Sequence, residues 1–170
     1  MQFIEKINND MIINESDILK FEKIIGREVP GVLKDFYRSY NGASIKLCIF
    51  DIDGYDFEVF EILPLVHGKC CVEKIYEGDR EDGYIRESLI PLANNSGGDC
   101  YYWDKNDEKI YLIYCDDIEN EILIADSIEE FFDIMNKNNC GWITIDREKK
   151  SDPSNCEIEI TSETEKFVRF

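Results

Sequence analysis

The sequence contains 170 residues, 44% of them hydrophobic and 12% aromatic, which is enough for one globular domain with a buried core. Its 37 acidic residues against 19 basic ones give a formal net charge of −18, which excludes nucleic acid and an anionic membrane surface as partners. No segment approaches the ~20 apolar residues of a membrane span, and the first residues do not form a secretory signal. We therefore expect a soluble, cytoplasmic protein.

Two short helices are predicted near the start of the chain. The first begins near Ser16 and Asp17, whose side chains can cap a helix, and ends at Gly26, where a left-handed residue is expected. The second begins near Pro30 and ends at Asn41-Gly42. The apolar faces expected from helical spacing are Ile18, Phe21, Ile24 and Ile25 in the first helix, and Leu33, Phe36, Tyr37 and Tyr40 in the second.

From residue 45 the apolar residues recur with a period of about two, which indicates strands. Asp53-Gly54 is the turn signal of a hairpin. A weak pattern follows, with a helical turn at 72–76 and an acidic loop at 77–83. The strands expected are 45–50, 55–59, 89–93, 100–103, 109–114 and 122–125, with a break at Asp116-Asp117. Because no crossover helix is evident between them, the pattern favours antiparallel pairing over a parallel α/β sheet.

The capping box Ser127-x-x-Glu130 starts a further helix. Its expected buried face is Ile128, Phe131, Phe132 and Met135. The remaining segments are predicted as a helix end at 138–141, a strand at 142–145, a polar loop at 149–155 and a charged edge strand at 156–161. No repeat or linker interrupts the chain, so we predict a single domain over residues 1–170.

Seven cysteines are scattered along the chain, none with the C-x-x-C spacing of a zinc site. The odd number and the irregular spacing predict free thiols in a reducing compartment, most of them buried as small hydrophobic residues. Adjacent Cys70 and Cys71 are expected to point to opposite faces of a strand. The single histidine, His67, leaves a Cys–His couple open as an alternative.

Three segments in order carry a family resemblance. Residues 18–42 are two helices joined by Val-Pro and ending in Tyr-Asn-Gly, residues 89–99 read LIPLANNSGGD, and residues 125–131 form a helix start. Together they resemble the SUKH superfamily, whose founders are yeast regulators of cell-wall synthesis and whose bacterial members are mostly immunity proteins. The match spans 18 to about 135 and leaves 140–170 as a C-terminal extension.

The resemblance implies an α+β fold: a curved, mainly antiparallel sheet with two N-terminal helices and one helix from the C-terminal half packed around it. It also implies a non-enzymatic binding protein, most simply a bacterial immunity protein that neutralises a toxin, with a regulatory scaffold as the alternative. The charge predicts a basic protein partner such as a nuclease, because a nuclease holds phosphates with Lys and Arg.

Acidic residues expected on loops are the candidate contacts with this partner. Residues 99–133 contain 12 acids and 2 bases. The candidates are Asp51, Asp53, Asp56, Glu58, Asp99, Asp104, Asp116, Asp117, Glu119 and Glu121. Within the Gly97-Gly98-Asp99 turn, the Asp99 carboxylate is also expected to accept hydrogen bonds from turn N–H groups.

One enzymatic alternative comes from the segment 48–54, an apolar strand that ends in Asp-x-Asp-Gly. It resembles the first motif of haloacid-dehalogenase-type phosphotransferases, in which Asp51 would attack phosphorus, Asp53 would act as acid and base, and Asp116-Asp117 would bind magnesium. That fold is parallel α/β, which the strand pattern disfavours. The same acids do not fit a calcium loop, because Ile62 stands where a glutamate is required. We predict no catalytic residue, cofactor or metal site.

Overall fold

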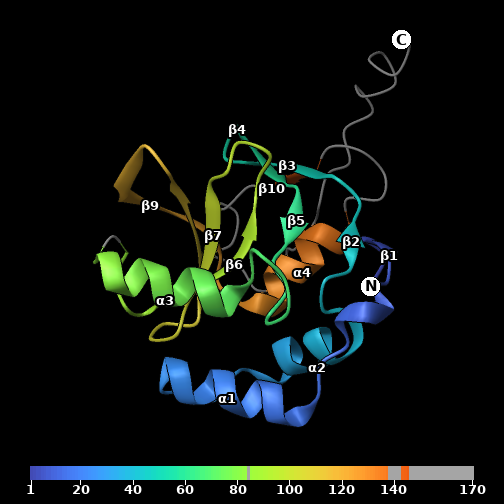
Figure 1. Cartoon of the computed structure of the whole chain (residues 1–170). Coiled ribbons are helices and arrows are strands. Elements are labelled where there is room, and N and C mark those ends of the chain that lie inside the picture. Colours follow the sequence, from blue (N-terminus) through green and yellow to red (C-terminus); the bar gives the residue numbers. More distant parts are fainter. Residues whose placement is uncertain (84, 138–142, 146–170) are drawn as a thin grey trace.

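Residues 1–83, 85–137 and 143–145 are described by a computed structural model, in which they form four α-helices and ten β-strands (Figure 1). The helices are α1 (Glu15–Ile25), α2 (Gly31–Tyr40), α3 (Val72–Asp82) and α4 (Ile128–Lys137), with a 3-10 helix at Asn9–Met11. The strands are β1 (Ile4–Lys6), β2 (Ser44–Ile45), β3 (Cys48–Ile52), β4 (Tyr55–Val59), β5 (Glu61–Ile62), β6 (Leu89–Asn94), β7 (Cys100–Asp104), β8 (Ile110–Tyr114), β9 (Asp117–Ala125) and β10 (Ile143–Ile145).

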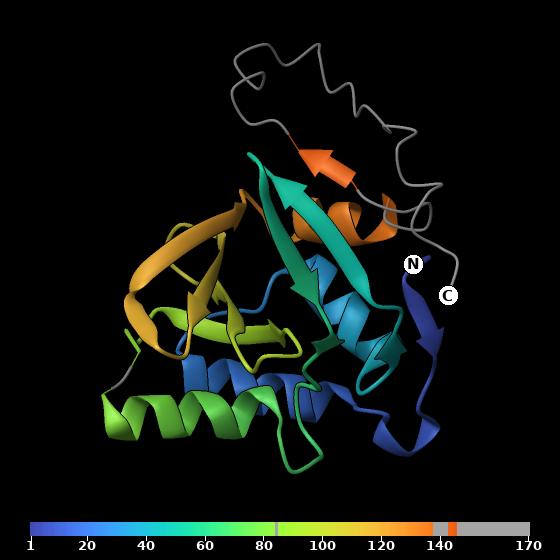
Figure 2. The same ribbon diagram turned by 90° about the horizontal axis from the view of Figure 1, so that it is seen from above.

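The strands form three sheets, with the orders β1-β2, β10-β3-β4 and β5-β6-β7-β8-β9. All pairs are antiparallel except β10–β3, which is parallel and which the strand pattern did not predict. The predicted strand over 45–50 is divided between β2 and β3. Figure 1 places α1 and α3 below the strands and the β3–β4 hairpin at the top, and Figure 2 shows β9 at the outer edge of its sheet. The α+β class with mainly antiparallel sheets is confirmed.

Helix α1 begins slightly earlier than predicted, because Asn14 is its N-cap. The Asn14 Oδ1 accepts a hydrogen bond from the Ser16 N–H at 2.8 Å, and the Asp17 Oδ2 accepts one from the Asn14 N–H at 3.0 Å. The predicted capping residues therefore lie within the first turn, where Asp17 completes a capping box. Gly26 ends the helix in a left-handed conformation with φ 69°, as predicted.

Two other segments differ from their predictions. Residues 77–83 are not an acidic loop, since most of them continue α3, which ends at the left-handed Gly83. Only Val72 and Tyr76 are buried in this helix, so its apolar stripe was too narrow to predict beyond one turn. Strand β9 begins at Asp117, well before its predicted start at residue 122. Its first half is polar and lies at a sheet edge, so no hydrophobic pattern indicated a strand there.

Aromatic residues from both ends of the described chain meet in the core. The Phe36 ring of α2 lies 4.9 Å from the Phe132 ring of α4 and 6.3 Å from the Phe3 ring, centroid to centroid. All four residues predicted for the buried face of α4 are buried. Tyr40 is only half-buried, at the margin of the predicted face of α2. The two helices therefore pack as the apolar spacing predicts.

Asn41, directly after α2, is a buried polar residue with 4% of its surface exposed. Its Nδ2 donates to the carbonyl oxygens of Met11, at 2.8 Å, and Val66, at 3.1 Å, and its Oδ1 accepts from the Leu65 N–H at 2.7 Å. The next residue, Gly42, has φ 67°, and a Cβ there would overlap the Met11 Sδ. The Asn-Gly pair thus joins the end of α2 to two distant segments.

No helix among the described residues is long and apolar enough to cross a membrane. The helix end predicted at 138–141, the polar loop at 149–155 and the edge strand at 156–161 lie outside the described residues.

Candidate functional site

The β3–β4 hairpin carries four of the candidate contact residues. Its register places Asp51 directly opposite Asp56, on the face turned away from the buried residues of the two strands. Asp53, with φ 55°, and Gly54, with φ 85°, form the tight turn between them. The Asp51 Oδ1 accepts a hydrogen bond from the Gly54 N–H at 3.2 Å, which fixes the turn. Because like charges opposite each other destabilise a sheet, this pair weakens the hairpin that carries it.

Glu58, at the other end of the hairpin, connects it to the five-stranded sheet. Its Oε2 accepts a hydrogen bond from the Ser96 Oγ at 3.1 Å, and its main-chain oxygen accepts one from the Tyr101 hydroxyl at 2.7 Å. Glu58 is half-buried, whereas Asp56 is exposed. Three of these four acids lie on strands and one in the turn, so the expectation that they lie on loops holds for Asp53 alone.

Asp99 is held inside the turn between β6 and β7. Its Oδ2 accepts from the Asn95 Nδ2 at 2.8 Å, and its Oδ1 accepts from the Cys115 N–H at 3.0 Å. Gly98, with φ 93°, makes the preceding bend possible. The Asp99 carboxylate thus accepts hydrogen bonds, but from the Asn95 side chain and from the N–H of Cys115 in the neighbouring turn rather than from the turn N–H groups that were predicted. Both carboxylate oxygens are therefore occupied by structural contacts.

Asp104 and Glu121 both form ion pairs with Arg86. Arg86 donates to Glu121 through Nε at 2.6 Å and Nη2 at 2.8 Å, and its Nη1 donates to the Asp104 Oδ2 at 2.5 Å. Hydrogen bonds to Glu121, and then to Asp104, raise the pKa of the Arg86 guanidinium above its usual range. Asp104 is only 3% exposed and ends β7, so it is not the loop residue that was predicted. Its burial removes it from the candidate surface.

Asp116, Asp117 and Glu119 are the exposed acids at the start of the edge strand β9. Asp116 lies in the turn before β9, whereas Asp117, Glu119 and Glu121 belong to the strand itself, contrary to the predicted loop. None of the three exposed acids takes part in an ion pair with another described residue. Their carboxylates add to the negative potential on this side of the sheet.

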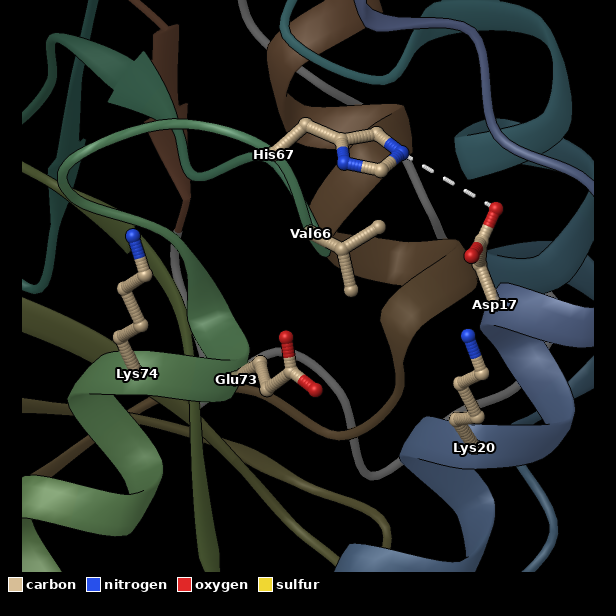
Figure 3. Close-up of a pocket in the computed structure, with 6 residues that line it drawn as sticks. All are labelled: Asp17, Lys20, Val66, His67, Glu73 and Lys74. Carbon is tan, nitrogen blue, oxygen red and sulfur yellow. Dashed lines mark ion pairs between the residues drawn. The ribbon is translucent and has the colours of Figure 1, made fainter.

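A small cavity of about 300 Å³ lies at the loop before α3, and Figure 3 shows it. It is lined by Asp17, Lys20, Val66, His67, Glu73 and Lys74. His67 has φ 68°, and its Nε2 lies 4.0 Å from the Asp17 Oδ2 (Figure 3). Sequence reasoning did not predict this cavity, because its lining residues come from segments far apart in the chain. Its two lysines and two carboxylates balance, so charge alone selects no ligand for it.

Among the described residues no disulfide joins the five cysteines. The burial expected for most of them holds for Cys48 and Cys71, whereas Cys100 is partly buried and Cys70 and Cys115 are exposed. Cys71 is buried and Cys70 exposed, but the pair lies directly before α3, with Cys71 as the N-cap, and not in the strand that the prediction assumed. Burial raises the pKa of the Cys100 thiol to about 12, and the nearby Asp99 carboxylate raises the pKa of the Cys115 thiol. Both shifts disfavour the reactive thiolate. No cysteine of the described segments lines the cavity of His67, so the geometry there gives no support to a Cys–His couple.

Asp51 and Asp53 lie in an antiparallel hairpin rather than at the carboxyl end of a parallel strand that leads into a helix. The parallel neighbour of β3 is the short strand β10, which reaches it from the far end of the described chain. Among the described residues, no group of three or more His, Cys, Asp and Glu side chains is arranged to hold a metal ion. The arrangement offers a charged surface carried mainly by strands.

Residues 12–134 match the model of the SMI1 / KNR4 family (SUKH-1). The match includes α1, α2, the β3–β4 hairpin, the five-stranded sheet and most of α4. It covers most of the chain and begins before residue 18, where the resemblance was expected to start. Comparison with curated proteins gives no match.

Proposed function

The chain belongs to the SMI1 / KNR4 family (SUKH-1), and from this we propose that it is a bacterial immunity protein that neutralises a basic toxin, such as a nuclease, by direct binding. Family membership supports a non-enzymatic immunity or regulatory role that acts through a partner protein. The net charge of −18 favours a basic partner over a neutral one. The family match is the observation that supports the proposed role, and the negative net charge supports the proposed mode of binding.

The proposed surface consists of two acidic patches. We define the hairpin patch as Asp51, Asp53, Asp56 and Glu58, and the β9 patch as Asp116, Asp117 and Glu119. Glu121 and Asp104 are left out because they pair with Arg86, and Asp99 because both of its carboxylate oxygens accept hydrogen bonds. Asp51 and Glu58 are kept, because each accepts a side-chain hydrogen bond through one carboxylate oxygen only. A toxin that binds phosphates with Lys and Arg presents the complementary charge. Charges of this kind steer encounter and raise the association rate.

We expect the association rate to fall by about tenfold between low and physiological ionic strength, while the dissociation rate changes little. The experiment first identifies a toxin gene beside this gene and then measures binding kinetics against its catalytically inactivated product, and the absence of such a gene would favour the regulatory scaffold. Replacing Asp53 and Asp56 with asparagine should lower the association rate at low salt. A matched control replaces Glu77 and Glu81 with glutamine, which removes the same charge from the exposed face of α3, at the opposite end of the molecule (Figure 1).

An association rate that responds neither to salt nor to the two aspartate substitutions would reject electrostatic capture. An equal fall in the association rate of the α3 control would mean that net charge, rather than the hairpin patch, determines that rate. No binding to the toxin would reject the immunity role and favour the regulatory scaffold. A regulatory protein is expected to bind a signalling partner instead.

A further inference from the structure

Asn41-Gly42 is the only Asn-Gly pair in the sequence, and the fold requires both of its residues. The Asn41 amide makes three hydrogen bonds with main-chain groups of two distant segments. Gly42 has φ 67°, a left-handed conformation, and the Met11 Sδ occupies the space that a Cβ would need. Another residue at either position would therefore lose buried hydrogen bonds or overlap the Met11 side chain.

An asparagine followed by glycine is chemically labile, because the chain can attack its own side chain there. The glycine N–H loses its proton to hydroxide, and its nitrogen bonds to the asparagine Cγ, since no Cβ on the glycine obstructs the approach. The Cγ–Nδ2 bond then breaks, and the amide nitrogen, protonated by water, leaves as ammonia. Water opens the resulting cyclic imide at either carbonyl carbon, which gives aspartate or its β-linked isomer, isoaspartate.

The folded chain holds the Asn41 side chain in a state that opposes this reaction. Its Nδ2 donates to two main-chain carbonyl oxygens, at 2.8 and 3.1 Å, and its Oδ1 accepts from the Leu65 N–H at 2.7 Å. Attack converts the planar amide to a tetrahedral carbon and releases Nδ2, and both steps break these hydrogen bonds. The residue is only 4% exposed, so little water reaches the leaving nitrogen.

Neither reaction product can replace asparagine in the closed fold. An aspartate carboxylate has no N–H to donate and would face the carbonyl oxygens of Met11 and Val66. Isoaspartate also lengthens the main chain by a methylene group, directly before a glycine that is packed against the Met11 side chain. Closing the fold around either product therefore leaves buried acceptors without a donor.

We infer that Asn41-Gly42 is a site of spontaneous deamidation that reacts only when the end of α2 separates from residues 65–66, and that either product destabilises the fold. Each opening exposes the pair to the reaction, so the rate of deamidation measures how often this part of the molecule opens. The inference does not depend on the proposed function, because the reaction needs water and no partner protein.

The test compares deamidation with hydrogen exchange in the intact protein at the same mildly alkaline pH. The opening that frees the Asn41 Oδ1 also exposes the Leu65 N–H to exchange. Deamidation is measured by mass spectrometry of the tryptic peptide 39–46, in which Asn41 is the only side-chain amide, from the replacement of NH2 by OH. The synthetic peptide 39–46 gives the rate without a fold.

We expect the native protein to deamidate at least about 100-fold more slowly than the synthetic peptide. This ratio should agree within about tenfold with the protection factor of the Leu65 amide, because both report the population of the same open state. A native rate equal to that of the peptide would overturn the inference, as would a ratio outside the tenfold range. A peptide that does not deamidate would also overturn it.

Phe36→Ala and Phe60→Ala form a matched pair that alters the opening without changing the reacting residues. Phe36 is buried where α2 contacts α4, whereas Phe60 is exposed. The first variant should speed deamidation of the native protein by more than about tenfold and the second by less than about twofold. Equal rates in the two variants would contradict an opening that involves α2.

The deamidated protein carries an additional negative charge, so ion exchange separates it from the unmodified protein. Its unfolding midpoint should lie at a lower denaturant concentration than that of the unmodified protein, because the lost hydrogen bonds are not restored. An unchanged midpoint would overturn the second part of the inference.

Discussion

Replacing Phe36 with alanine should lower the free energy of unfolding by about 3–5 kcal/mol, as large-to-small changes at fully buried aromatic sites do. Phe36 is 2% exposed, and its ring contacts the rings of Phe3, Tyr37, Tyr40 and Phe132. Removing it leaves a cavity between α2, α4 and the N-terminal strand. Because these elements are fixed by other contacts, they cannot collapse fully into the space.

The measurement is denaturant unfolding, with Phe60→Ala as the control. Phe60 undergoes the same chemical change at an exposed position and should cost less than about 1 kcal/mol. An equal loss in the two variants would mean that α2 does not pack against α4 as described.

Replacing Asn41 with alanine should have an effect of similar size, about 3–5 kcal/mol, for a different reason. The substitution removes little apolar surface but leaves the Leu65 N–H and the Met11 and Val66 carbonyl oxygens without their partner. Each unsatisfied buried group costs about 1–3 kcal/mol. Asn41→Asp should also destabilise the protein, because a carboxylate would face two carbonyl oxygens.

Two readouts separate this mechanism from a general loss of stability. Denaturant unfolding gives the free energy, and native-state hydrogen exchange should show faster exchange of the Leu65 amide in Asn41→Ala. Asn120→Ala, at an exposed position on β9, is the control and should change neither quantity. An unaltered Leu65 exchange rate would contradict the role assigned to Asn41.

The sequence was most informative where local patterns determine the structure. The helical spacing in α1, α2 and α4 and the Asp53-Gly54 turn depend on neighbouring residues, and all four were predicted. The role of Asn41 was not, because its partners lie 24 to 30 residues away. Its position marks a helix end, whereas its three hydrogen bonds depend on how distant segments meet. The parallel β10–β3 pair was missed for the same reason.

In the candidate site, too, the local sequence predicted some features and the long-range contacts determined others. Composition and resemblance predicted an acidic surface, but they could not separate carboxylates that face solvent from those that support the fold. Asp104 and Glu121 have the same charge as Asp56, yet Arg86 holds the first two. Arg86 stands out in the sequence only as one basic residue among many acids. Conversely, Tyr55 reads as part of an alternating strand, and only the structure shows that its ring is exposed.

Contacts between the two ends of the described chain have a consequence for biosynthesis. The Gln2 N–H donates to the Asn136 Oδ1 at 2.8 Å across 134 positions, and the Phe3 ring lies 5.8 Å from that of Phe132. Because a ribosome releases the N-terminus first, these two contacts cannot form until α4 has emerged from the exit tunnel. The core is therefore completed only after most of the chain is synthesised, and such long-range closure is intrinsically slow. A nascent chain stalled before α4 would expose Phe3 and Phe36 to the chaperones that bind apolar segments.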